Sequence, residues 1–496
     1  MLQRSILRIF QNRKTLNILI YFILLVYLFY PSIDPDLGWH IKYGEFFAVN
    51  HKLLINNIFS WTLSGYEWFS ISWIYDFLLY LLFPKISFFG LSFLAVLICI
   101  ATYYFTFKKY PLPYHLLLPF SFLFIYFLSP VASVGFRVQL FELLYIAILN
   151  YCFLAVGKVE IKQVIFLPLI MIAWSNTHGS FIVGFLIVGF FVFCGVFHTV
   201  IDLINSQRAA SDKIKKISGF LIIGVLSFIS TLLNPYGGKI YLQVIDYFPS
   251  KLAKGVNEWF PVLFPSELWF FLFVWTLVLM YVVYQKRRTT QGLFEAMISL
   301  TFSYLAFKSR RMVAPFIVAT FPIVLAYVCT NPKLLKFRPM SLLNILVFFM
   351  VLTMLANVLF VRLPGLKFGF ISTEDYCQMG ARCSVAAANY LKENVSSEKI
   401  FTPYDVGGFL IWKNPKSKVF IDGRMDQWKK NGVSPFYDHQ KITFENDTIF
   451  FDKYGFLAAY VFPESSLDGY LRTKVNEWKM VFEDKNAVIY QKIKND

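Results

Sequence analysis

Charged residues are scarce in this chain. Only 16% of its 496 residues are Asp, Glu, Lys or Arg, whereas a soluble domain carries roughly 25%. Hydrophobic residues make up 57% of the chain and aromatic residues 20%, so most of the chain is too apolar to be exposed to water. This balance excludes an ordinary cytosolic enzyme. It also excludes a nucleic-acid-binding protein of the usual kind, although the net charge is +17.

The signatures of several soluble enzyme classes are missing too. The sequence contains no Gly-Lys-Ser/Thr phosphate loop, no Gly-x-Ser-x-Gly elbow, no His-Glu-x-x-His and no Cys-x-x-Cys pair. Its six His and six Cys are scattered, and their spacing indicates no structural zinc site. Cys377 and Cys383 fall in a charged C-terminal region, where an oxidising compartment would favour a local disulfide.

Long apolar tracts are what the chain does have. A membrane-spanning helix needs about 20 apolar residues, and several tracts without Asp, Glu, Lys or Arg approach or exceed that length: Leu16–Tyr30, Phe88–Phe107, Gln163–Ile201, Ile217–Leu233, Leu268–Tyr284, Met312–Asn331 and Ser341–Val361. The polar residues 176–179 divide the longest tract into two. Weaker candidates are Ile71–Phe83, Tyr114–Leu128, Val138–Val156 and Gly292–Phe307. We expect an α-helical polytopic membrane protein with roughly eleven to thirteen transmembrane helices.

Short basic clusters between these tracts predict the orientation. The positive-inside rule places residues 1–15, Arg208–Lys216, Lys286–Arg288 and Lys333–Arg338 on the cytoplasmic side. Because no small-residue cleavage site follows Tyr30, we expect the first apolar run to stay as a helix rather than to act as a signal peptide. The protein is then multi-pass in the cell inner membrane or plasma membrane, with its first loop outside.

The C-terminal region changes character. Residues 363–496 are charged and rich in turn residues, with strand-length apolar runs at Lys418–Ile421, Phe456–Phe462 and Ala487–Tyr490 and helical patterns at Val385–Asn394 and Leu467–Val475. We therefore predict a transmembrane module over residues 1–362, with its first external loop at 31–70. A small extracytoplasmic α/β domain follows over residues 363–496.

Chemistry concentrates in the loop after the first helix. Asp34 and Asp36 lie two residues apart, and Trp39 and His40 follow them. Carboxylates at a membrane interface are costly and need a compensating role. They could act as a general base or bind a divalent cation such as Mg²⁺ or Mn²⁺. The alternative is that they cap an interfacial helix. Asp76, near the external end of the next helix, is a second acid that could assist Asp36.

Cations and aromatic residues elsewhere complete a candidate substrate site. Bidentate Arg suits phosphate oxygens, and the predicted external side carries cations that the positive-inside rule does not explain. Polar turns and interfacial aromatic residues could contact a sugar or a lipid chain, although structural roles explain them equally well. For Arg137, the alternative is a structural pairing with Glu142, which follows on the same predicted helix. The candidate substrate-binding residues are Arg137, Lys308, Arg310, Arg311, His40, Asn176, His178, Tyr236 and Trp259.

Together these features resemble a known superfamily. An Asp-Pro-Asp motif directly after the first membrane helix, a Trp-rich external loop, many crossings and an external C-terminal domain look like the C-type (GT-C) membrane glycosyltransferases. The motifs Asp34 to His40, Tyr404-Asp405-x-Gly407-Gly408-(x)3-Trp412 and Ile421-Asp422-Gly423-Arg424 are most similar to uncharacterised bacterial members. The chain lacks the His-Phe-Asp-Glu form of the protein mannosyltransferases and the Trp-Trp-Asp signature of the oligosaccharyltransferase.

The resemblance implies an inverting transferase that takes a sugar from a lipid-linked donor in the membrane, whose carrier is a polyprenyl phosphate or diphosphate. The acceptor would be an extracytoplasmic glycan, lipid or protein. The resemblance also implies that Asp36, helped by Asp34, is the base or metal ligand. Asp36 is preferred because it precedes Trp39 and His40. Two alternatives stay open: a transporter or flippase of a lipid-linked saccharide, and a non-catalytic scaffold in envelope-glycan assembly.

The tail motifs receive a structural interpretation. Gly407 and Gly408 permit close backbone approach, and Asp422 with Gly423 makes a turn after a buried strand. Acceptor binding by this domain is the alternative interpretation.

Overall fold

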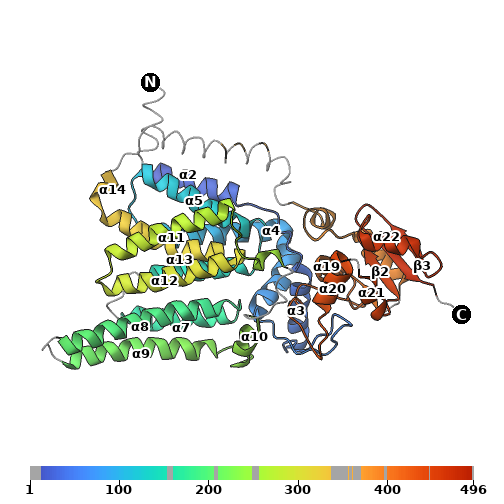
Figure 1. The fold of residues 1–496 in the computed structure, drawn as a ribbon, viewed down its shortest axis with the longest axis horizontal. Coiled ribbons are helices and arrows are strands. Elements are labelled where there is room, and N and C mark those ends of the chain that lie inside the picture. The colour runs from blue at the N-terminus through green and yellow to red at the C-terminus, as the bar shows by residue number, and fades with distance from the viewer. Residues whose placement is uncertain are drawn as a thin grey trace, which may run out of the picture. The chain divides into compact units, whose positions relative to one another are not determined.

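A computed structural model describes residues 13–152, 160–205, 210–247, 256–336, 370–395, 399–445 and 447–493, with single positions 353, 356 and 360 besides. The chain forms two compact units that interleave along the sequence (Figure 1). Unit 1 comprises residues 1–30, 92–238 and 258–368, and unit 2 comprises residues 31–91, 239–257 and 369–496. The boundary that the sequence places after residue 362 stays a prediction.

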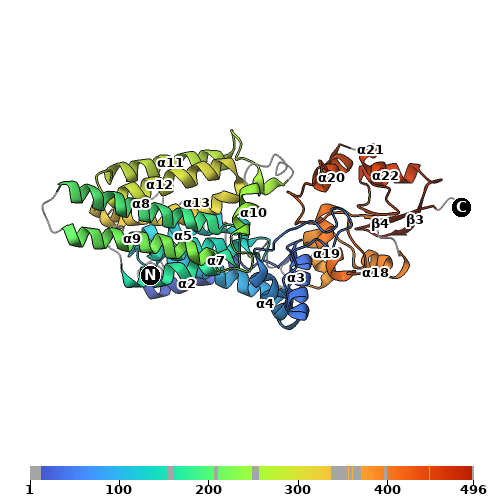
Figure 2. The ribbon, with the colours of Figure 1, turned by 90° about the horizontal axis from the view of Figure 1, so that it is seen from below.

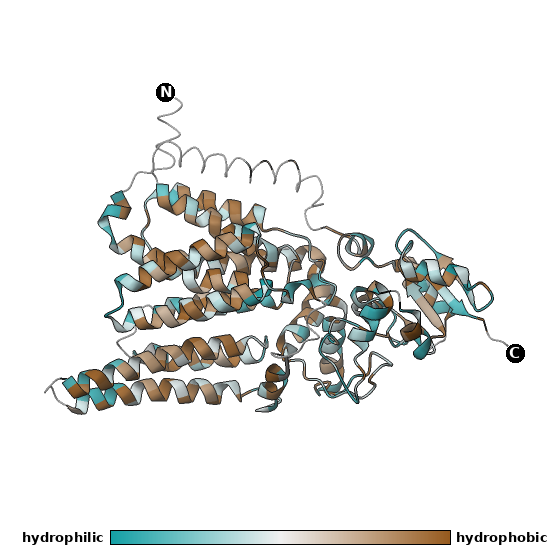
Figure 3. Cartoon of the chain, in the orientation of Figure 1, coloured by the Kyte–Doolittle hydropathy of each residue, from teal (hydrophilic) through white to brown (hydrophobic). Residues whose placement is uncertain are grey.

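Unit 1 is built from apolar helices. Its elements are α2 (Arg13–Tyr27), α5 (Tyr114–Ala132), α6 (Gln139–Cys152), α7 (Ile161–Ser175), α8 (Phe181–Asn205), α9 (Ala210–Thr231), α11 (Glu267–Gln285), α12 (Thr290–Lys308), the short turn η3 (Arg310–Met312), α13 (Val313–Thr330) and α14 (Pro332–Lys336). Hydrophobic residues, coloured brown, predominate along these helices (Figure 3). Helix α13 packs against α5, α6, α11 and α12 and is buried on all sides, as expected of a central helix that is hydrophobic all round.

Six of the described helices are long and apolar enough to cross a membrane: Trp73–Phe107, Tyr114–Ala132, Phe181–Asn205, Ala210–Thr231, Glu267–Gln285 and Arg310–Thr330. Three shorter apolar helices cover Lys14–Tyr27, Gln139–Cys152 and Gln163–Ser175. The predicted class, a polytopic helical membrane protein, is confirmed. The number of crossings stays a prediction, because the Ser341–Val361 tract lies almost wholly outside the described residues.

Two of the predicted tracts show how local sequence shapes the helices. The tracts at 71–83 and 88–107 form one helix, α4 (Trp73–Phe107), which contains Pro84 and is broken by the non-helical backbone of Ser87. A proline inside a helix removes one hydrogen bond and kinks it. The long 163–201 tract is divided at Asn176, as predicted, because α7 ends there and α8 begins at Phe181.

Unit 2 combines the loop after the first helix, residues 31–70, with the C-terminal region. Its helices are α3 (Leu37–Asn50), the start of α4, α10 (Lys239–Tyr247), α17 (Thr373–Tyr376), η6 (Cys377–Ala381), α18 (Val385–Asn394), α19 (Tyr404–Lys413), α20 (Pro435–Phe444), α21 (Thr448–Lys453) and α22 (Ser466–Thr473). The short turn η2 (Asn257–Trp259) is divided between the units in the sequence, since Asn257 belongs to unit 2 and Glu258 to unit 1. Its four strands are β1 (Ile400–Phe401), β2 (Ala458–Val461), β3 (Trp478–Glu483) and β4 (Val488–Lys492).

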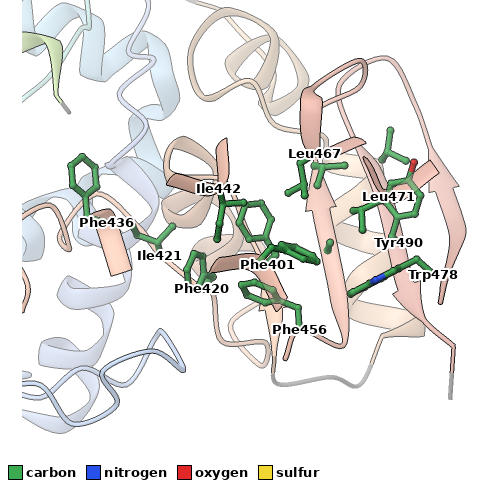
Figure 4. Close-up of a cluster of buried hydrophobic side chains, with 14 of the residues drawn as sticks. Phe401, Phe420, Ile421, Phe436, Ile442, Phe456, Leu467, Leu471, Trp478 and Tyr490 are labelled. Carbon is green, nitrogen blue, oxygen red and sulfur yellow. The ribbon is translucent and has the colours of Figure 1, made fainter. Parts of the chain in front are cut away.

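The strands form one mixed sheet in the order β1-β2-β4-β3. Strand β1 runs parallel to β2, and the other neighbouring pairs are antiparallel. Helices cover both faces, with α20, α21 and α22 on one side and α18 on the other (Figure 2). An aromatic core that includes Phe401, Phe420, Phe456 and Trp478 fills the space beside the sheet (Figure 4). The predicted small α/β domain is confirmed.

Three details of this unit bear on the sequence predictions. Cys377 and Cys383 form the expected disulfide. The run at 456–462 contains β2, and the run at 487–490 overlaps the first part of β4. The run at 418–421 is not a sheet strand, since Val419 instead makes an isolated parallel bridge with Ser60 of the loop at 31–70. That run is buried because it joins the loop to the C-terminal region.

Candidate functional site

Asp36 lies in unit 2 at the residue before α3. Its Oδ1 accepts a hydrogen bond of 2.9 Å from Nε1 of Trp39, one turn further along. It makes no capping hydrogen bond to the backbone of α3, so the capping interpretation is wrong for Asp36. The residue is half-buried, and the indole of Trp39 fixes the orientation of its carboxylate.

Asp34 is buried, with 3% of its surface exposed. Its Oδ1 accepts a hydrogen bond of 3.2 Å from the backbone N–H of Asp36. Its carbonyl oxygen accepts one of 2.8 Å from the hydroxyl of Tyr376. These bonds shape the backbone around Asp36, and the difference in exposure separates the roles that the two acids can play.

His40 and Asp76, both predicted site residues, meet in a buried network. Nδ1 of His40 lies 2.5 Å from Oδ1 of Asp76, and the hydroxyl of Ser70 donates to Oδ2 of Asp76 at 2.5 Å. The ring of His40 stacks on Trp39 with centroids 3.5 Å apart. Because Trp39 also donates a hydrogen bond to Asp36, the His40–Asp76 pair helps to fix the indole that holds the Asp36 carboxylate. Carboxylate–imidazole pairs of this kind fix the ring orientation and tautomer.

Two buried tyrosines stand near the acids as neutral donors. Burial raises the pKa of Tyr376 well above its ordinary value, and the negative charges of Asp34 and Asp36 raise it further. Burial likewise raises the pKa of Tyr404, with added contributions from acids that include Asp36. The Tyr404 hydroxyl donates to the carbonyl oxygen of Gly423 at 3.3 Å. Both hydroxyls therefore remain protonated donors.

In unit 1, two of the predicted phosphate-binding cations converge on one carboxylate. An Arg137 guanidinium nitrogen lies 2.7 Å from Oε1 of Glu258, and an Arg311 guanidinium nitrogen lies 3.7 Å from Oε2 of the same residue. Burial disfavours the Glu258 carboxylate, but the charges of Arg137 and Arg311 outweigh it and lower the pKa of Glu258 below its ordinary value. Arg311 also lies over the ring of Trp259, 5.0 Å from its centroid.

His178 links this arginine cluster to a buried acid. Its Nε2 lies 3.3 Å from Arg311, and its Nδ1 lies 3.7 Å from Oε2 of Glu142. Glu142 is 3% exposed, and among the described residues its Oε1 has no hydrogen-bond partner. A buried carboxylate oxygen without a partner is energetically costly. The Oε1 atom of Glu142 can therefore accept a further hydrogen bond.

The other candidates of unit 1 are placed differently. Lys308 and Arg310 are exposed, with Lys308 over the ring of Tyr304. The amide of Asn176 donates to the carbonyl oxygens of Ile172 and Leu233, at 2.8 and 3.0 Å, and so joins α7 to the segment that follows α9. The backbone of Tyr236 forms a turn by donating to Asn234 Oδ1 at 2.8 Å. The cluster thus contains Arg137, Arg311, His178 and Trp259 from the predicted set.

A divalent cation at Asp34 and Asp36 stays a sequence-based prediction. Throughout the described part of the chain, no three His, Cys, Asp or Glu side chains are grouped so that they could hold a metal ion. Asp76 and His40 are bound to each other, and the Asp34 carboxylate accepts from the backbone. We therefore assign no chemical step to a metal.

Neither a protein-family model nor a curated protein sequence matches the chain. Solved structures do match it. The crystal structure of the oligosaccharyltransferase of Archaeoglobus fulgidus in the apo form matches with a TM-score of 0.51 at 10% sequence identity, over 90% of this chain and 69% of that one. At this identity the likeness shows the fold. The chain therefore shares the overall fold of that oligosaccharyltransferase.

The sequence interpretation missed four residues of these networks. Glu258 was not assigned to the site, and Glu142 was considered only as a structural partner of Arg137. In the structure Arg137 pairs with Glu258, and Glu142 lies beside His178. Gly423 and Arg424 belong to a tail motif that received a structural interpretation, with acceptor binding as the alternative. The signal for these two was the Ile-Asp-Gly-Arg motif itself, because an Asp and an Arg two residues apart in a strongly apolar segment require a buried partner.

Proposed function

We propose that this protein is an integral-membrane glycosyltransferase of the C type, which moves a sugar from a polyprenyl-phosphate-linked donor to an extracytoplasmic acceptor. The half-buried Asp36 carboxylate carries the proposal. It follows the first apolar helix, is held by Trp39 at 2.9 Å and is backed by the Trp39–His40–Asp76 network. A base works best when its geometry is fixed before the substrate arrives.

The chemistry follows from this placement. Asp36 accepts the proton of the acceptor's hydroxyl or amide group as that group attacks the anomeric carbon of the sugar. The bond between this carbon and the donor phosphate oxygen breaks, and polyprenyl phosphate leaves with the electron pair. Attack from the side opposite the phosphate inverts the anomeric carbon. Asp34 acts through its bond to the Asp36 backbone, at 3.2 Å, and not as the base.

The arginine cluster of unit 1, considered by itself, is a candidate phosphate-binding group. Arg137 and Arg311 are partly exposed, at 15% and 24% of their side-chain surface, and guanidinium groups bind phosphate oxygens in a bidentate manner. Glu258 holds both cations in place when no phosphate is present. The fold match to an oligosaccharyltransferase supports a lipid-linked donor.

The test uses the full chain in lipid nanodiscs, a panel of polyprenyl-phosphate sugars, and mass spectrometry of the released polyprenyl phosphate. We expect Asp36→Asn to lower turnover by about 10²- to 10⁴-fold, the usual contribution of a general base, with donor binding unchanged. Adding EDTA to each sample tests the metal prediction separately.

Asp452→Asn is the matched control, because it makes the same change at an exposed acid of α21. Full turnover by Asp36→Asn would refute the role of Asp36. Donor binding without release by the wild type, together with movement of the intact saccharide across the bilayer, would instead identify a transporter.

A further inference from the structure

Gly423 of the C-terminal region lies against the Asp36 carboxylate. If Gly423 carried a Cβ, this atom would lie 1.8 Å from Oδ1 of Asp36 and 3.3 Å from its Oδ2. Real Cβ atoms essentially never approach other heavy atoms this closely. The Asp36 carboxylate is therefore enclosed on two sides, by the indole of Trp39 and by the backbone of Gly423.

A buried ion pair fixes the position of Gly423. Asp422 and Arg424, its two neighbours, are joined by two hydrogen bonds of 2.6 Å, and both side chains are 0% exposed. Burial opposes the charged form of Arg424, but Asp422 and Tyr43 outweigh it and raise the pKa of Arg424. A paired buried charge resists displacement, because moving either partner leaves the other uncompensated.

The same pair is anchored to the helix that follows Asp36. Arg424 donates to the hydroxyl of Tyr43 in α3 at 2.9 Å, and to Oδ1 of Asn57 in the loop at 31–70 at 3.4 Å. The guanidinium carbon also lies 5.1 Å from the ring centroid of Trp428. The turn over residues 422–424 therefore has a fixed position relative to α3.

A second close approach holds the neighbouring backbones together. A Cβ at Gly38, in α3, would lie 2.0 Å from the carbonyl oxygen of Gly408, in α19. The reciprocal Cβ at Gly408 would lie 2.5 Å from the carbonyl oxygen of Pro35. Helices α3 and α19 thus pack with their backbones in contact on either side of Asp36.

We infer that the Asp422–Gly423–Arg424 turn positions the Asp36 carboxylate for proton transfer. The inference rests on the proposed function and gives the C-terminal region a part in the reaction. Gly423 contributes by having no side chain, and the ion pair contributes by keeping its backbone in place. A Cβ at this position displaces the flexible Asp36 side chain, since the turn itself is anchored. Misplacing a reacting group by about 1 Å can cost about 100-fold in rate.

The test compares the wild type, Gly423→Ala, Asp36→Ala and the double variant Asp36→Ala/Gly423→Ala, all as full chains in nanodiscs. We expect Gly423→Ala to lower kcat for polyprenyl-phosphate release by about 100-fold, with KM and the Kd for polyprenyl phosphate unchanged. We also expect its loss in Tm to disappear in the Asp36→Ala background, because the clashing carboxylate is then absent.

Gly469→Ala is the control, since a Cβ on Gly469, in α22, would have no other heavy atom within 4 Å; this variant should keep the wild-type kcat. Trp39→Phe is a second probe that does not depend on Gly423→Ala folding. It removes the indole N–H on the other side of the carboxylate, and kcat should fall with KM unchanged.

Two results would overturn the inference. One is wild-type kcat in folded Gly423→Ala; the other is an equal Tm loss with and without the Asp36 carboxylate. Failure of the proposed function looks different: the wild type then releases no polyprenyl phosphate from any donor, whereas the Tm comparison still reports whether the contact exists.

Discussion

The two candidate clusters are built by different means. Around Asp36 in unit 2, residues are fixed by burial, by backbone contact at Gly38 and Gly423, and by an ion pair with no exposed surface. In the arginine cluster of unit 1, the groups are partly exposed: Glu258 keeps 41% of its side-chain surface, and Arg311 keeps 24%. The first arrangement is held by packing, and the second by charge balance.

This difference matches the tasks that we propose for the clusters. A base that removes a proton must keep one geometry, so rigidity is useful. A phosphate site must bind and release a charged ligand. A carboxylate such as Glu258, which a phosphate can replace as the partner of Arg137 and Arg311, suits that task. Each of the following three changes would sharpen or break the contrast.

The largest effect is expected from breaking the buried pair of unit 2. Arg424→Met leaves Asp422 charged, buried and without its partner, so we expect the free energy of unfolding to fall by about 3–5 kcal/mol. Thermal unfolding of the full chain followed by Trp fluorescence measures this loss. Lys479→Met is the matched control, because Lys479 is an exposed cation of β3 and its loss should cost less than about 0.5 kcal/mol.

A double variant tests whether the uncompensated charge of Asp422 causes the loss of stability in Arg424→Met. Adding Asp422→Asn to Arg424→Met removes the buried negative charge and should recover part of the lost stability. If Arg424→Met and Lys479→Met unfold at the same temperature, the turn is not held as we describe.

An intermediate effect is expected from acid. Burial lowers the pKa of His439 in α20 from 6.5 to about 3, and its Nε2 accepts from the backbone N–H of Tyr404 at 3.2 Å. The unfolded chain binds a proton near pH 6.5 while the folded chain does not. The stability from neutral His439 is therefore complete above pH 6.5 and is lost as the pH falls towards 3. The expected loss at pH 5 is about 2 kcal/mol.

Unfolding temperatures at pH 7 and pH 5 check this sign. His439→Gln keeps an acceptor for Tyr404 but cannot take up a proton, so the shift between the two pH values should shrink. His51→Asn removes an exposed histidine of the same unit and should leave the shift unchanged. An identical shift in His439→Gln would contradict the assignment to His439.

The smallest effect is expected in unit 1. Glu258→Gln keeps the shape of the side chain but frees the charge of Arg137 and Arg311, so polyprenyl phosphate should bind about two- to fivefold more tightly, as befits a partly exposed ion pair. The gain should shrink at high salt. Titration calorimetry in nanodiscs measures it, with Glu267→Gln, at an exposed acid of α11, as the control. Weaker binding by Glu258→Gln would show that Glu258 is needed for the ligand and does not compete with it.

Much of the fold was predictable because apolar length and strand-length runs are local signals. The division of the 163–201 tract at Asn176 and the helix at 385–394 appear where the sequence placed them. Strand β1, which is two residues long, gave no usable pattern. The run at 418–421 was misassigned because burial against Ser60, far away in the sequence, produces the same apolar pattern as a sheet strand.

The candidate site was predictable only in part. The sequence singled out Asp36, His40 and Asp76, because acids and imidazoles beside apolar tracts are conspicuous. It could not show that Asp76 binds His40, or that Arg137 and Arg311 share Glu258. His40 and Asp76 are 36 positions apart, and Arg137 and Glu258 are 121 apart. No local pattern reports a contact over such separations.

The sequence by itself determined the membrane class, the expected helices and the types of residue available for chemistry, because hydropathy and charge act locally along the chain. Only the tertiary structure decided which of the two acids is fully buried and which groups hold each of them. Asp34 and Asp36 are nearly equivalent in sequence, yet one is buried and the other half-buried. The missing side chain of Gly423 becomes meaningful only where folding brings that backbone against the Asp36 carboxylate.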